Sequence, residues 1–279
     1  MPIHDQGYRR YLGTRDAIGR SWQVMTRAGV MSIVSKRVFM GLMLFAWIPF
    51  VVRVVQFYFS TTLAQASFLA PTGETFREFL DQQGIFVFFV TIYVGAGLIA
   101  NDRRANALQL YLSKPMTSAE YIAGKLAILF LFLVVVTFLP AILLLITQAL
   151  LAGSLTFVRN NIYLVPAITL YSLAQVLLAA TTMLALSSLS KSSRFVAVMY
   201  AGLFFFTTAL FQTLRGITGR SSFAWLSPSA ALQQIGDVIF RLEPRYQLSP
   251  ALAALAVLVM IAGSIFILMR RVRGVEIVT

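Results

Sequence analysis

Six long apolar runs divide the chain, and polar or charged segments separate them. A helix needs about 20 apolar residues to cross the ~30 Å hydrocarbon layer of a bilayer. The pattern therefore predicts an all-α membrane protein with six transmembrane helices, at about residues 38–59, 85–100, 121–150, 162–186, 195–214 and 250–269. The second run is short and can begin earlier, near Phe79. The third is long enough to tilt, or to kink at Pro140.

Residues 1–37 precede the first run, and we expect a cytoplasmic tail followed by an amphipathic helix over 15–37. Its apolar side carries Ile18, Trp22, Met25, Gly29 and Ile33, and its polar side carries Arg20, Gln23 and Arg27. An apolar stripe with tryptophan opposite a basic stripe is typical of a helix lying at the headgroup level of a membrane. A cytosolic helix packed on a partner protein is the alternative. No signal peptide is expected, because a long polar segment comes before the first apolar run.

Composition agrees with membrane insertion. Hydrophobic residues make up 58% of the chain and charged residues 12%, against about 25% charged in a typical soluble domain. The net charge of +13 indicates orientation and contact with anionic lipid headgroups here, not binding of nucleic acid. In a six-span topology, 16 of the 23 Lys and Arg residues fall on the side of the two termini. The positive-inside rule then predicts a multi-pass protein of the inner (plasma) membrane, with residues 38–270 as transmembrane domain and 271–279 as a cytoplasmic tail.

Catalytic equipment is missing from the sequence. There is no cysteine, and the one histidine, His4, has only Asp5 as an acidic neighbour, so we expect a tail residue and not a metal ligand. No phosphate-binding loop of the type G-x-x-x-x-G-K-[ST] and no hydrolase motif occurs. We therefore expect a chain that is not itself an enzyme and that holds no cofactor or metal.

Three polar residues within the spans are candidates for a translocation path. Arg53 lies in the outer part of the first span, where it either snorkels to the surface or lines a substrate path. Gln148 and Gln175 lie in the third and fourth spans, where interhelical hydrogen bonds are the alternative to contact with a substrate. Between the last two spans, Ser227-Pro228 starts a predicted short amphipathic helix on the outer side.

The segment 101–125 between the second and third spans is the most charged stretch inside the bundle sequence. Residues 105–112 favour a helix, on which Leu108, Tyr111 and Leu112 share one face. Lys114-Pro115 ends that helix, and Ser118 is expected to cap the next one. An apolar helix face outside the bilayer requires a partner protein.

This segment resembles the first cytoplasmic loop of type-2 ATP-binding-cassette (ABC) transporter permeases. The matching residues are Asp102-Arg103, Leu108, Leu110, Leu112-Ser113-Lys114-Pro115, Glu120 and Gly124-Lys125. Asn106, Ala107 and Gln109 stand where the family has Gly, Thr and Glu. An ordinary basic loop between two spans is the alternative interpretation.

The resemblance implies a permease subunit of an ABC exporter, with two permease copies in a homodimer or heterodimer. A separate ABC ATPase subunit would carry the ATP and Mg. The residues expected to dock the coupling helix on that ATPase are Asp102, Arg103, Arg104, Leu108, Tyr111, Leu112, Lys114, Pro115 and Glu120. The short helix after Ser227 would help close an outer gate, or else only cap the bundle.

Two other classes of function stay open. One is a stand-alone secondary transporter or channel, and the other is a membrane anchor that transports nothing. The scarcity of charge within the spans favours a hydrophobic or amphiphilic cargo over a small ion.

Overall fold

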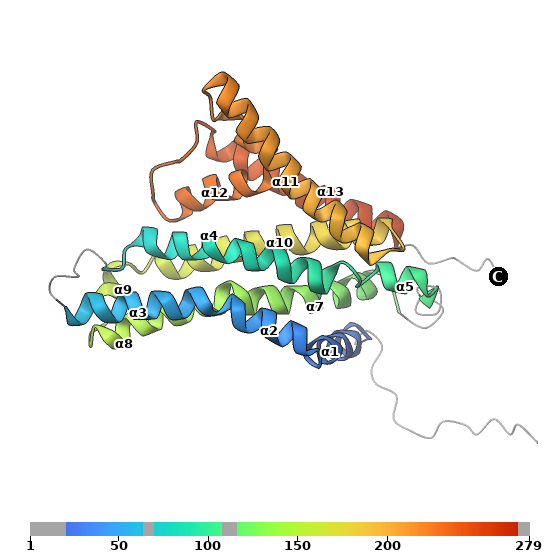
Figure 1. Cartoon of the computed structure of the whole chain (residues 1–279), viewed down its shortest axis with the longest axis horizontal. Coiled ribbons are helices and arrows are strands. Elements are labelled where there is room, and N and C mark those ends of the chain that lie inside the picture. The colour runs from blue at the N-terminus through green and yellow to red at the C-terminus, as the bar shows by residue number, and fades with distance from the viewer. Residues whose placement is uncertain (1–20, 64–69, 108–115, 273–279) are drawn as a thin grey trace, which may run out of the picture.

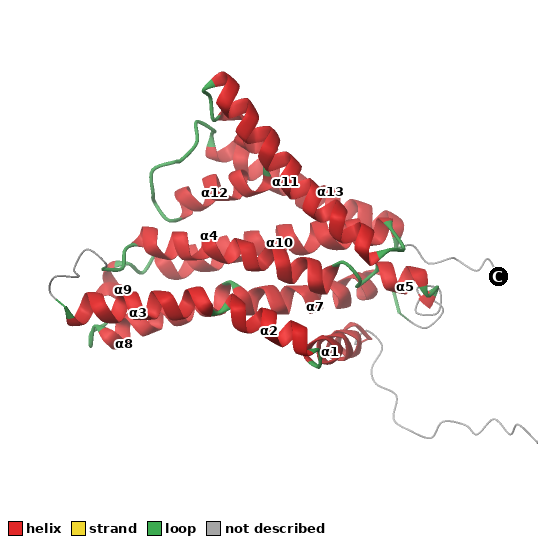
Figure 2. Ribbon diagram, viewed as in Figure 1, coloured by secondary structure: helices red, strands yellow, loops and turns green. Residues whose placement is uncertain are grey.

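The computed structural model describes residues 21–63, 70–107 and 116–272, and within these ranges every regular element is helical (Figure 2). Within these ranges, six helices are long and apolar enough to cross a membrane, which confirms the prediction of an all-α protein with six candidate spans. They are Arg37–Thr62, Gly73–Arg104, Ser118–Leu151, Leu164–Leu189, Ser193–Thr218 and Pro250–Arg271.

The first four spans run along the long axis of the molecule, whereas α11 (Ser193–Thr218) lies oblique to it (Figure 1). We call the end that carries α1 (Ser21–Val34), α5 (Ala100–Arg104) and the last turn of α13 (Pro250–Arg271) the α5 end. The opposite end, with α9 (Thr156–Asn160) and α12 (Pro228–Ile239), is the α12 end. In the second, third and fourth spans, half or more of the most apolar stretch is buried, against less than a quarter in the other three. The core therefore consists of these three spans, and the first, fifth and sixth line its outside.

Two of the spans are interrupted near prolines. The first span divides at Trp47 into α2 (Arg37–Ala46) and α3 (Ile48–Thr62), just before Pro49. The third divides at Thr137 into α7 (Ser118–Val136) and α8 (Phe138–Leu151). Pro140, where a kink is expected, lies in the first turn of α8. Because proline has no N–H, it cannot bond the carbonyl four residues earlier, which places the break one turn before it.

The second span begins twelve residues earlier than predicted, at Gly73 in place of residue 85. Thr72 caps α4 (Gly73–Val90) in a reciprocal pair of side-chain bonds with Thr75. Glu74, Glu78 and Asp81, which fall between the first two predicted spans, therefore lie on this helix. Beyond α4 the span continues through a π-helical turn, η2 (Thr91–Gly95), to α5.

α1 runs across the bundle axis, and Figure 1 shows it almost end-on. It packs on α7 through the predicted apolar side. Gly124 of α7 permits the approach, because a Cβ there would lie 3.2 Å from the Trp22 carbonyl oxygen and 3.1 Å from the Met25 sulfur. Thr26 Oγ1 also donates to the Gly124 carbonyl at 3.2 Å. Part of the apolar side of α1 therefore covers protein: Ile33 is buried, whereas Trp22 remains 36% exposed. Residues 15–20 lie outside the described ranges.

The α1–α7 crossing predicts a position-specific effect of glycine replacement. Gly124→Leu should destabilise the protein by about 1–3 kcal/mol, because the new side chain meets the α1 backbone. Gly263→Leu on α13 is the matched control, since no described atom lies within 4 Å of the position that a Cβ would take there. Free energies of unfolding in mixed micelles measure both, and equal stability of the two variants would contradict a tight crossing.

Candidate functional site

Asp102 and Arg103, two predicted docking residues, are engaged inside the bundle. The Asp102 carboxylate pairs with Lys125 Nζ of α7 at 2.7 Å and accepts a bond from the Tyr121 hydroxyl at 2.7 Å. Arg103 donates to the carbonyl of Ser188 at the end of α10 (Leu164–Leu189). These contacts fasten α5 to both the third and the fourth span.

Ser187 reinforces the same junction. Its hydroxyl accepts from the backbone N–H groups of Ile99 at 3.1 Å and Ala100 at 3.0 Å, and donates to the Ala96 carbonyl at 3.0 Å. The chain is irregular between η2 and α5, so these backbone groups need a partner from elsewhere. A fully buried serine on α10 supplies it.

The remaining docking candidates are placed differently. Glu120 accepts from the backbone N–H of Thr117 at 2.9 Å, and Thr117 accepts from that of Glu120 at 3.2 Å. Thr117, and not Ser118 as predicted, is therefore the N-cap of α7, in a capping box. Arg104 is exposed.

The predicted coupling helix is described only at its start. α5 ends at Arg104, and Asn106 has a left-handed φ of 53°, so the predicted start at Ala105 is not helical. Ala107, the last described residue before the gap, is helical. Leu108, Tyr111, Leu112, Lys114 and Pro115 lie outside the described residues.

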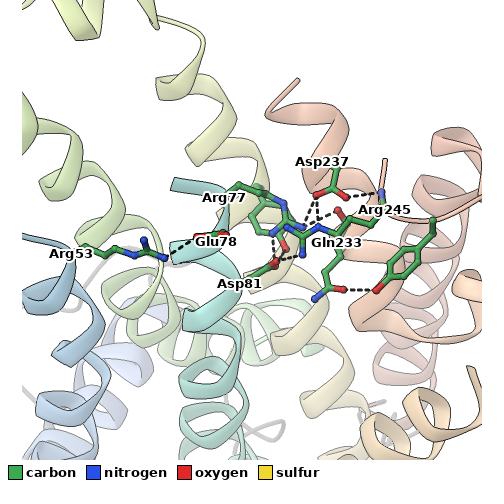
Figure 3. A network of polar contacts seen from close by, with 9 residues as sticks. Arg53, Arg77, Glu78, Asp81, Gln233, Asp237 and Arg245 are labelled. Carbon is green, nitrogen blue, oxygen red and sulfur yellow. Dashed lines mark hydrogen bonds and ion pairs between the residues drawn. The ribbon is translucent and has the colours of Figure 1, made fainter. Parts of the chain in front are cut away.

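A buried charge cluster occupies the α12 end (Figure 3). The Arg77 side chain of α4 is fully buried and pairs with Asp81 one turn later. Its Nη2 lies 3.3 Å from Asp237 Oδ1 and donates to the Gln233 carbonyl at 2.9 Å, both on α12. The guanidinium lies over the Tyr171 ring of α10, at 4.6 Å from the centroid. One arginine therefore joins the second span, the fourth span and α12.

Arg245 completes the cluster from the loop after α12. It contacts Asp81 Oδ2 at 3.0 Å and Asp237 Oδ1 at 3.2 Å. The Tyr171 hydroxyl donates to Asp81 Oδ1 at 3.0 Å. Two arginines thus face two aspartates, and the cluster is neutral. Burial raises the pKa of the Asp237 carboxyl above its usual value, and the charges of Arg77 and Arg245 oppose that rise.

Sequence reasoning missed this cluster because it began the second span at residue 85 and so left Arg77 and Asp81 outside any helix. Their i, i+4 spacing between apolar residues was the available signal. Gly236 is equally important, since a Cβ there would overlap Arg77 and the Tyr171 ring. Only glycine lets α12 approach this closely.

The described part of the chain has two pockets of note, and two of the three residues predicted to line a translocation path, Arg53 and Gln148, line neither of them. Arg53 pairs with Glu78 at 3.1 Å and donates to Gln56 at 3.0 Å, on the flank between α3 and α4 (Figure 3). Gln148 is buried on α8, 5% exposed, away from both pockets.

Gln175 does line a pocket. A cavity of about 350 Å³ lies between α4, α10, α11 (Ser193–Thr218) and α12. Its walls are mainly apolar and aromatic, including Phe88, Tyr200 and Phe205, and Gln233 and Ser229 of α12 form part of its roof. A more open cleft of about 610 Å³ lies at the α5 end, between α1, α5 and α7.

Comparison with known proteins gives no assignment: no protein-family model and no curated protein sequence matches this chain.

The charge cluster predicts that Arg77 is essential for stability. Arg77→Met should lower the free energy of unfolding by about 3–5 kcal/mol, because it leaves the buried carboxylate of Asp237 and the partly buried one of Asp81 with one arginine. Arg77→Met combined with Asp237→Asn should recover part of the loss. The exposed Arg220→Met is the control and should change stability by less than about 0.5 kcal/mol. Chemical denaturation in mixed micelles measures all three, and an Arg77→Met protein as stable as the control would contradict the prediction.

Proposed function

We propose that this chain is the transmembrane permease subunit of an ABC transporter, an exporter driven by a separate ATPase subunit. The observation that carries the proposal is the anchoring of α5. This short helix leads directly into the loop that resembles the ABC permease coupling loop. It is bound to α7 through Asp102 and to α10 through Arg103 and Ser187.

A helix anchored in this way can transmit a movement of the following loop to the core spans. If the ATPase moves the loop, the ion pair of Asp102 with Lys125 and the bonds to α10 pass the movement to two core spans. The spans then switch as rigid bodies between inward-open and outward-open states. The chain itself supplies no ATP chemistry, and ATP and Mg belong to the partner.

Orientation follows from the charges at the two ends. The α5 end carries exposed basic residues such as Arg104, Lys191 and Arg271. At the α12 end, Arg53, Arg77 and Arg245 are paired with carboxylates, whereas Arg159, Arg215, Arg220 and Arg241 are exposed. In a six-span topology the side of the two termini nevertheless carries 16 of the 23 Lys and Arg residues. The positive-inside rule therefore favours the α5 end in the cytoplasm of the inner membrane, near anionic headgroups. A second permease copy completes the transporter.

A secondary transporter is the second candidate, because interrupted spans favour it. Helix breaks at membrane depth are typical of ion-coupled transporters, and the first three spans here are all interrupted. The cavity between α4, α10, α11 and α12 argues against a plain anchor.

Purification of tagged protein from native membranes in mild detergent tests the proposal. We expect a stoichiometric partner that carries a phosphate-binding loop. Leu108→Asp with Tyr111→Asp should reduce its recovery at least tenfold, because charges replace the apolar docking face. The control is Leu155→Asp with Ile162→Asp, at exposed positions of the α12 end. Recovery of a single-chain oligomer, with ion-coupled uptake in vesicles lacking ATP, would establish the secondary transporter instead.

A further inference from the structure

We infer that the pocket between α4, α10, α11 and α12 binds an uncharged, single-chain amphiphile that enters from the lipid. The site lies within one copy of the chain, so the binding itself does not depend on the proposed function. If the chain is a permease, this amphiphile belongs to the class of molecules that it transports, and that part of the inference rests on the proposed function.

Size sets the first limit on the ligand. Small-molecule pockets in proteins span about 300–1,000 Å³, and this one has about 350 Å³. At ~30 Å³ per water molecule of the liquid, that volume holds roughly a dozen non-hydrogen atoms. A chain of about ten carbons with a small head fills it, whereas a two-chain phospholipid does not fit.

The pocket has no charge to offer a ligand. Among the described residues that line it, Asp81 is the one carboxylate, and none is a lysine or an arginine. Both Asp81 oxygens are already used, Oδ1 by Tyr171 and Arg77 and Oδ2 by Arg245. A charged ligand would be buried without a counter-ion, which costs several kcal/mol. The ligand is therefore uncharged.

Hydrogen-bonding capacity is nevertheless present. Gln175 is 7% exposed, and its side-chain oxygen has no hydrogen-bond partner within the described residues. A buried amide oxygen without a partner is costly, and a ligand hydroxyl that reached it would remove that cost. Hydroxyls of Thr208 and Ser229, which lie 3.3 Å apart, add further polar groups toward α12.

The rim of the pocket faces outward from the bundle. Ile85 and Phe89 of α4 and Phe205 of α11 line the pocket and are 50–67% exposed. α11 packs on α10, η3 (Ser222–Leu226) and α12. It reaches α4 through rings, Phe88 lying 5.5 Å from Phe205 and 5.7 Å from Tyr200. Between α4 and α11 this side is closed mainly by aromatic side chains, which gives a molecule in the lipid a way in.

Photolabelling of the chain alone in phosphatidylcholine nanodiscs tests the site. The probe is a diazirine derivative of 1-decanol, and peptide mapping should place the label on α4 and α11. Unlabelled 1-decanol should compete at least tenfold better than decanoate or decyltrimethylammonium. Labelling spread over all lipid-facing helices, or equal competition by the charged compounds, would overturn the inference.

Two matched pairs of variants sharpen the test. Gln175→Leu should weaken competition by 1-decanol about fivefold, as expected for one hydrogen bond. Gln148→Leu should not change it, although Gln148 is similarly buried and also has an unpartnered oxygen within the described part of the chain. Ile85→Trp should block the mouth and reduce labelling at least fivefold. Val52→Trp on α3, at the same 58% exposure, should leave it intact.

Misfolding would not explain a difference between Ile85→Trp and Val52→Trp, because both substitutions replace exposed residues. Equal effects within either pair would contradict the site. Because no ATPase is present, a negative result would remove the pocket assignment and leave the co-purification test of the proposed function untouched.

Discussion

The burial of Arg77 constrains the whole α12 end. A guanidinium cannot lose its proton, so its charge must be neutralised where it lies. Asp81 provides one carboxylate from the same helix, and Asp237 provides the other from α12. If α12 moved away, Arg77 would lose a carboxylate and the Gln233 carbonyl together. These contacts therefore hold α12, which forms part of the pocket wall, against α4.

The interrupted spans need hydrogen-bond partners for the backbone groups at their breaks, because lipid offers none. Side chains from neighbouring core spans provide them. Ser187 bonds the backbone of the break before α5, and Gln83 of α4 donates to the Ala46 carbonyl where α2 ends, at 3.2 Å. Several polar residues within the spans thus serve the backbone of another helix. Polarity within a span is therefore weak evidence for a translocation path, and Arg53 is a case in point.

The sequence predicts what depends on local pattern. Run length predicts the six spans, and helical periodicity predicts which side of α1 packs. The start of α4 was not predicted, because charged residues at 74, 77, 78 and 81 interrupt the apolar run. Thr72 is a residue type typical of helix N-caps, and this was a signal for the true start. The charge cluster depends on α12 folding back onto α4 across 156 residues, and no local signal encodes that contact. Gln148 and Gln175 look alike in sequence, and only packing distinguishes them.

α10 links the two ends of the molecule. It is the span with the largest buried share. Ser187 and Ser188 hold α5, and Tyr171 and Gln175 meet the charge cluster and the pocket. At 1.5 Å per residue, Gln175 and Ser187 lie about 18 Å apart along one uninterrupted helix. No break in α10 separates the residues that hold α5 from those that line the pocket. Under the proposed function, α10 would be the element that converts movement of the loop into a change at the ligand.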